Sequence, residues 1–122
     1  MNGTEWLVEA SGCDPALLCD KAALTELFDE IVGDLVLHVV GVPAWHVFPG
    51  AGGITGVYLL AESHLTVHTF PEYGSLCLNL FCCRPRAEWD FRAGLAKHVG
   101  ASDVAVRRVE RRHADAIVTA AR

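Results

Sequence analysis

Two neighbouring segments alternate strictly between aliphatic and polar side chains, and this pattern limits the possible folds more than any other feature. In residues 64–69, Leu65 and Val67 oppose two imidazoles and a hydroxyl. In residues 75–83 the leucines share a face with Cys82, and the opposite face holds Ser75, Cys77, Asn79, Phe81 and Cys83. Because successive side chains of a strand point to opposite sides of a sheet, both segments are predicted as strands with one buried face.

Two further segments are predicted as helices. Asp14 followed by Pro15 is a typical helix start, and apolar residues at helical spacing continue it over residues 15–32. Pro85 opens a second helix that carries Trp89 and ends at Gly100. Both helices are amphipathic, so each is expected to cover a sheet.

The remaining apolar segments are predicted as strands over residues 5–10, 35–42, 55–61 and 103–109. Pro43 and Pro49 mark a loop of about ten residues after the second of these strands, and this loop carries Trp45 and Phe48. The order β-α-β-β-β-β-α-β with short turns predicts an α+β fold, a two-layer α/β sandwich. Its sheet is mostly antiparallel, with the helices packed on one face.

Length and charge exclude several classes of protein. A chain of 122 residues without repeats is expected to form one domain over residues 1–122, and its net charge of -5 disfavours a nucleic-acid partner. No apolar run approaches the roughly 20 residues that span a bilayer, and the first residues do not resemble a signal peptide. We expect a cytoplasmic protein without membrane contact, whose five cysteines are free thiols.

One short stretch gathers most of the chemically reactive side chains: Ser63, His64, His68, Glu72, Cys82 and Cys83. They could be satisfied partners in a two-layer core. They could also bind a transition metal, but two histidines four residues apart on a strand are separated by about 13 Å, so no metal site is expected. The third interpretation is a Cys-His or Ser-His nucleophile site, and Ser63 lies at a strand boundary beside Glu62 and His64.

Residues 61–74, with the sequence AESHLTVHTFPEYG, resemble the signature of the prokaryotic S-adenosylmethionine decarboxylases, which usually reads ESHLxIHTWPEYG. The resemblance extends in weaker form to Gly53-Ile54-Thr55-Gly56 and to Phe81-Cys82-Cys83, where the family has Phe-Thr-Cys. These enzymes are pyruvoyl-dependent, self-cleaving proenzymes.

The resemblance implies that the Ser63 hydroxyl attacks the carbonyl of Glu62 and that the chain then splits at this bond. A β chain of residues 1–62 and an α chain of residues 63–122 result, and residue 63 becomes the pyruvoyl group. The family pattern assigns the proton transfers of this processing to His68 and to a hydroxyl residue, here Thr55, where serine is usual.

The resemblance also implies roles in decarboxylation. The pyruvoyl carbonyl forms a Schiff base with the substrate and withdraws electrons as carbon dioxide leaves. Cys83 is the implied proton donor, and the alternation agrees, because it groups Cys83 with the polar positions and Cys82 with the leucines. Glu72 would hold the ribose of S-adenosylmethionine, and Phe48 and Phe70 would stack on its adenine, although both rings could equally be core residues.

Four residues depart from the family pattern around the expected pocket: Phe70, Ser75, Asn79 and Arg84. We therefore expect an S-adenosylmethionine decarboxylase proenzyme for spermidine biosynthesis and keep two alternatives. One is an arginine or ornithine decarboxylase with the same pyruvoyl chemistry, and the other is a non-catalytic, unprocessed homodimeric relative. The family also implies a homodimer of α/β pairs.

Overall fold

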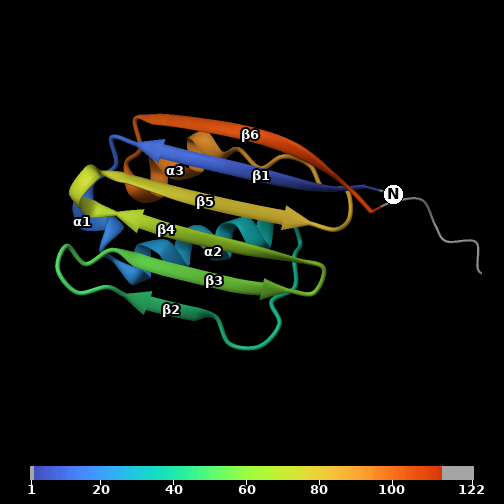
Figure 1. The fold of residues 1–122 in the computed structure, drawn as a ribbon, viewed down its shortest axis with the longest axis horizontal. Coiled ribbons are helices and arrows are strands. Elements are labelled where there is room, and N and C mark those ends of the chain that lie inside the picture. The colour runs from blue at the N-terminus through green and yellow to red at the C-terminus, as the bar shows by residue number, and fades with distance from the viewer. Residues whose placement is uncertain (1, 114–122) are drawn as a thin grey trace, which may run out of the picture.

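Six antiparallel strands form one sheet in the order β2-β3-β4-β5-β1-β6 (Figure 1). The computed structural model describes residues 2–113, so the last nine residues of the predicted α chain lie outside the described part. The strands are β1 (Asn2–Ser11), β2 (Ala44–Val47), β3 (Ile54–Leu60), β4 (Ser63–Phe70), β5 (Ser75–Cys82) and β6 (Asp103–Arg112). Consecutive strands β3, β4 and β5 are neighbours, whereas β1 lies between β5 and β6.

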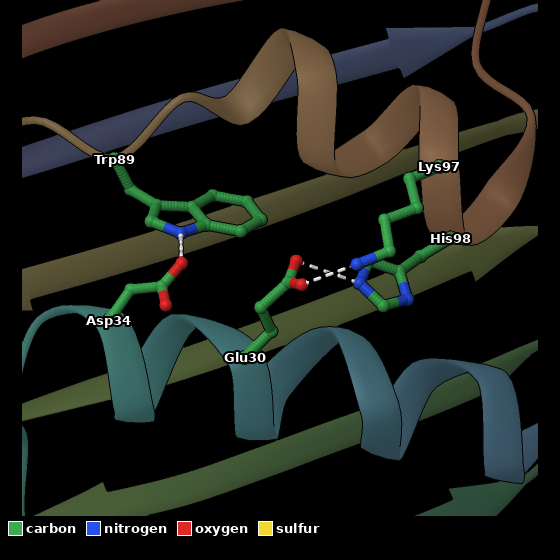
Figure 2. A network of polar contacts seen from close by, with 5 residues as sticks. All are labelled: Glu30, Asp34, Trp89, Lys97 and His98. Carbon is green, nitrogen blue, oxygen red and sulfur yellow. Dashed lines mark hydrogen bonds and ion pairs between the residues drawn. The ribbon is translucent and has the colours of Figure 1, made fainter.

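The helices cover one face of this sheet, as Figure 1 shows for α2 (Lys21–Asp34) and α3 (Phe91–Val99). A short helix α1 (Pro15–Leu18) lies near one end, and a 3-10 turn η1 (Pro71–Tyr73) joins β4 to β5. Polar contacts join α2 to α3 and to Trp89, which precedes α3 (Figure 2). The predicted two-layer architecture is confirmed.

The hydrophobic core lies between the helices and the sheet. Alternate residues of each inner strand are buried, and the alternation predicted for β4 and β5 is confirmed. The largest fully buried side chains are Trp6, Phe28, Phe91, Leu18, Leu24, Leu27, Ile31, Ile54, Leu65, Leu76, Leu80 and Leu95. The opposite face of the sheet carries no helix within residues 2–113 and remains open.

The helix boundaries differ from the prediction. The single helix expected over residues 15–32 is broken into α1 and α2, because Asp20 starts a new helix by accepting a hydrogen bond from the Ala22 amide. The second helix begins at Phe91 and not at Pro85, because the Asp90 carboxylate caps its first turn at Ala93.

The prediction of a buried strand over residues 35–42 is wrong. Val36 has a positive φ of 54°, Val42 is 93% exposed, and one isolated bridge joins Val39 to Leu60. The strand that pairs with β3 on the side away from β4 is β2, in the segment predicted as a loop. Trp45 holds it there by packing on Phe28 at a ring distance of 5.5 Å.

Candidate active site

The peptide bond between Glu62 and Ser63 lies at the tip of the β3–β4 hairpin. Leu60 pairs with Ser63, so the turn contains only Ala61 and Glu62. The amide of Cys83 donates a hydrogen bond of 2.9 Å to the carbonyl oxygen of Glu62. This carbonyl is therefore held and polarised by a neighbouring strand end.

A cavity of about 280 Å³, here called the turn cavity, surrounds this bond. Ser63 lines it together with Cys82, its register partner on β5. Burial raises the pKa of the Cys82 thiol, and a hydrogen bond with Ser63 only partly opposes this effect. The thiol beside Ser63 therefore holds its proton at neutral pH. Cys83 follows directly and is half-buried.

Two arginines that follow β5 in the chain, Arg84 and Arg86, line the turn cavity. Arg84 Nε forms an ion pair with Glu62 Oε1 at 2.8 Å, and Arg86 Nη2 lies 3.9 Å from Glu62 Oε2. Both follow Cys83 in the chain, so the hydrogen bond from Cys83 to the turn also sets their position. The cavity thus has a positively charged wall.

Five of the predicted site residues gather in a second place, here called the aromatic pocket. Thr55 and His68 are register partners, and Thr55 Oγ1 lies 2.9 Å from His68 Nδ1 in a hydrogen bond. They line a cavity of about 310 Å³ together with Phe48, Phe70 and Glu72. The predicted substrate residues and the predicted processing pair therefore share one pocket.

The two places are separated within one chain. His68 lies five residues along β4 from Ser63, a distance of about 17 Å in an extended strand. Ser63 also lies on the helix-facing side with Cys82, whereas His68 is on the open side of the sheet. The structure thus brings the predicted residues together in two groups and not in one.

Residues 4–112 match the family described as S-adenosylmethionine decarboxylase. The chain belongs to the S-adenosylmethionine decarboxylase family. The resemblance noted in the sequence is thereby confirmed, and the match includes both the turn cavity and the aromatic pocket.

Relatives in this family are named S-adenosylmethionine decarboxylase proenzyme. The protein from Pyrococcus furiosus is 37% identical over 89 residues, which cover 70% of this chain and 60% of that protein. The chain thus spans about three fifths of this relative's length. The protein from Clostridium tetani is 34% identical over 113 residues, which cover 89% of this chain and 86% of the relative.

The fold of the family is also matched. The crystal structure of the adenosylmethionine decarboxylase from Aquifex aeolicus superposes with a TM-score of 0.75 at 22% identity and covers 93% of each chain. This similarity confirms the α+β sandwich that the strand pattern predicted.

A chain of polar contacts on the open face of this decarboxylase-family sheet was missed by the sequence reasoning. His64 Nε2 and Asn79 Oδ1 are 2.8 Å apart, and Asn79 Nδ2 donates to Glu5 Oε2 over 2.7 Å. Glu5 also pairs with Arg111. The hydrogen bond from Asn79 is the main cause that lowers the pKa of Glu5, and Arg111 adds to it. These contacts depend on the register of β4 with β5 and of β1 with β5 and β6.

Proposed function

We propose that this chain is a proenzyme that cleaves itself between Glu62 and Ser63 and then decarboxylates S-adenosylmethionine, providing aminopropyl groups for spermidine. The observation that carries the proposal is the hydrogen bond from the Cys83 amide to the Glu62 carbonyl at the tip of a two-residue turn. Membership of the family supports it, because its relatives are named as proenzymes.

Cleavage requires that the Ser63 hydroxyl add to the carbonyl carbon of Glu62. Negative charge then develops on the carbonyl oxygen, and the Cys83 amide already points at that atom from 2.9 Å. Preformed donors of this kind stabilise such a transition state without reorganisation. Ser63 therefore needs only a group that accepts its proton.

The two product chains, residues 1–62 and 63–122, remain together in this proposal. The β chain contributes β1, β2 and β3, and the α chain contributes β4, β5 and β6. Because β1 lies between β5 and β6, the two chains alternate within the sheet. Separation would break three strand pairings, and neither half has enough surface to fold alone.

The residues around Ser63 fit a pyruvoyl group. The Cys83 amide and the protonated Cys82 thiol border the position of residue 63, and neither is an ion that would react with a keto carbonyl. When present, this group supplies an electron-withdrawing carbonyl that favours loss of carbon dioxide from a bound amino acid. Cys83 then donates the proton that replaces the carboxylate.

The aromatic pocket supports S-adenosylmethionine as the substrate. Phe48 and Phe70 offer two ring faces on which adenine can stack, and aromatic faces attract a sulfonium cation by roughly 0.5–2 kcal/mol. Glu72 lines the same pocket and can accept hydrogen bonds from ribose hydroxyls. Arginine and ornithine have no base to stack, so these two rings favour the nucleoside.

A homodimer explains the separation of the two groups of site residues. In a two-fold symmetric dimer every contact between the protomers occurs twice. The turn cavity of one protomer can therefore meet the aromatic pocket of its partner at two equivalent places. Within residues 2–113 no helix covers the sheet face opposite α2 and α3 (Figure 1). That face exposes apolar side chains that a partner would bury: Val57, Leu59, Phe70 and Val109.

None of the helices within residues 2–113 is long and apolar enough to cross a membrane. The proposal retains the cytoplasmic location expected from the sequence.

The test has two readouts. Intact mass of the purified protein should give two chains, cut between residues 62 and 63, with the α chain blocked by a keto group. Release of labelled carbon dioxide should be fastest from carboxyl-labelled S-adenosylmethionine, compared with arginine and ornithine. An uncut chain would contradict self-processing, and faster release from arginine or ornithine would contradict the substrate.

A further inference from the structure

We propose that Arg84 and Arg86 form a receptor for the carboxylate that cleavage creates on Glu62 and that they promote the step that releases it. This inference rests on the proposed self-cleavage. It assigns a role to two residues that neither the motif nor the aromatic pocket contains.

The charges around Glu62 are unbalanced before cleavage. The Glu62 side chain carries one negative charge, and two guanidinium groups face it, at 2.8 Å from Arg84 and 3.9 Å from Arg86. Both arginines line the turn cavity together with Ser63. One additional negative charge at this place would therefore be neutralised.

Arg86 also has a donor that is not used. Its Nε is buried and has no hydrogen-bond partner within residues 2–113. A buried donor without an acceptor is unfavourable, so a new acceptor at this place stabilises it. The Glu62 main chain lies close by, because the Cys83 amide joins it to the segment that carries both arginines.

Cleavage supplies such an acceptor in a defined step. Ser63 Oγ bonds to the carbonyl carbon of Glu62, the C–N bond breaks, and the hydroxyl proton passes to the nitrogen, which leaves an ester. A base then removes the Cα proton of residue 63 and the Cβ–O bond breaks, so Glu62 departs as a carboxylate. Water finally replaces the nitrogen of residue 63, which leaves as ammonia.

The second step places two carboxylates on one residue. Glu62 then carries its side-chain charge and its new terminal charge within a few ångströms, and like charges repel. The positive charges of the two arginines balance these two negative charges. Guanidinium groups bind carboxylates well because their donors form a planar fork. Arg84 and Arg86 therefore stabilise the leaving group of the elimination and do not act on the acyl shift.

The experiment follows cleavage of the full chain made by cell-free translation, with samples taken over time on denaturing gels. Each sample is divided and one half is treated with hydroxylamine at neutral pH, where it cleaves esters and leaves peptide bonds, including Asn2-Gly3, intact. The variants are Arg84→Met, Arg86→Met and the double variant, together with Arg84→Lys and Arg86→Lys, which keep the charge. Arg107→Met is the matched control, because this exposed arginine pairs with Glu9, far from the turn.

We expect the double methionine variant to cleave at least about tenfold more slowly than the unmodified chain, as loss of a charge-assisted contact to a leaving group predicts. The full-length chain that accumulates should be split by hydroxylamine. The lysine variants should recover most of the rate, and Arg107→Met should cleave normally.

Cleavage of the double variant at the unmodified rate would overturn the inference. So would a full-length chain that resists hydroxylamine, because the block would then precede the ester. Arg84 is 62% exposed in its side chain, so Arg84→Met alone decides the question if the double variant fails to fold. Failure of the unmodified chain to cleave would instead contradict the proposed function.

Discussion

Two adjacent cysteines at the end of β5 have different surroundings and therefore suit different tasks. Cys82 is 2% exposed, and burial raises the pKa of its thiol. Cys83 is half-buried, and its amide already contacts the turn. A proton donor must reach the substrate, which favours Cys83, while the buried thiol of Cys82 is better placed to pack against Ser63.

Replacing Cys83 by alanine should separate processing from turnover. The backbone amide that holds the Glu62 carbonyl remains in Cys83→Ala, so cleavage is expected to proceed. Carbon dioxide release should fall by about a hundredfold, the usual cost of losing a general acid. Gels and labelled-substrate assays on the same preparation measure cleavage and turnover. If Cys83→Ala released carbon dioxide as fast as the unmodified protein, another residue would have to be the proton donor.

Replacing Ser63 by alanine should abolish cleavage, because alanine has no hydroxyl to add to the Glu62 carbonyl. The uncut chain should nevertheless fold, since Ser63 is only half-buried and its strand pairing depends on the backbone. Intact mass spectrometry gives the result directly. Two chains from Ser63→Ala would show that the wrong bond has been assigned.

Alternation placed Cys82 on the same face as the leucines, and Cys82 is buried as expected, whereas the roles of the motif residues came from the family resemblance. The residues that contact the β3–β4 turn were not predictable from the sequence. Arg84 and Arg86 meet Glu62 only because β5 pairs with β4 in a particular register, and sequence patterns do not specify register across a sheet.

At the scale of elements, a cluster of polar contacts joins α2 to α3 (Figure 2). Glu30 accepts hydrogen bonds from Lys97 over 2.6 Å and pairs with His98 at 2.9 Å, while Asp34 accepts from the Trp89 indole over 2.8 Å. The hydrogen bond from Lys97 is the main cause that lowers the pKa of Glu30, and His98 contributes. The charged form of Glu30 therefore stabilises the contact between the helices.

This contact should weaken in acid. A carboxyl whose pKa is lower in the folded state stabilises the fold above its unfolded pKa, and the contribution is lost as the pH falls through the folded value. Glu30→Gln should therefore melt at a lower temperature than the unmodified protein at pH 7, and the difference should shrink below about pH 4.5. Thermal melts across this range test it, and a difference that does not change with pH would contradict the role.

Two glycines should respond oppositely to substitution by alanine. A Cβ on Gly56 would lie 2.2 Å from the Trp45 ring, which is packed against Phe28, so Gly56→Ala should lower the free energy of unfolding by about 1–3 kcal/mol. A Cβ on Gly33 in α2 meets nothing within 4 Å, so Gly33→Ala should raise it by up to about 1 kcal/mol. Denaturant titrations measure both, and equal signs would contradict this packing.

Strands and helices whose apolar residues recur at a regular spacing were predictable from the sequence, and the other elements were not. The strands around the motif appeared where alternation predicted them. Residues 35–42 are as apolar as a strand, but the positive φ of Val36 has no signature in the sequence. The position of β2 depends on Trp45 meeting Phe28 and Tyr58, which are distant in sequence. The start of α3 could have been found, because Asp90 is an ordinary N-cap.

At the scale of the whole molecule, a single measurement of mass in solution can test whether the protein forms the proposed dimer. The open sheet face and the separated site residues predict two α/β pairs per particle. Light scattering coupled to gel filtration should give twice the mass of 13.2 kDa. A monomeric mass would leave the turn cavity and the aromatic pocket about 17 Å apart and contradict a shared site.

The position of the proposed cut in the β3–β4 hairpin also changes how the protein can refold. While the turn is intact, it keeps β3 and β4 at an effective concentration of millimolar order, so refolding is a reaction of one chain. After the cut, the same pairing requires an encounter between two chains, and its rate depends on their concentration. The cleaved protein, once denatured in dilute solution, would therefore not regain the native state that the uncut chain reached before cleavage.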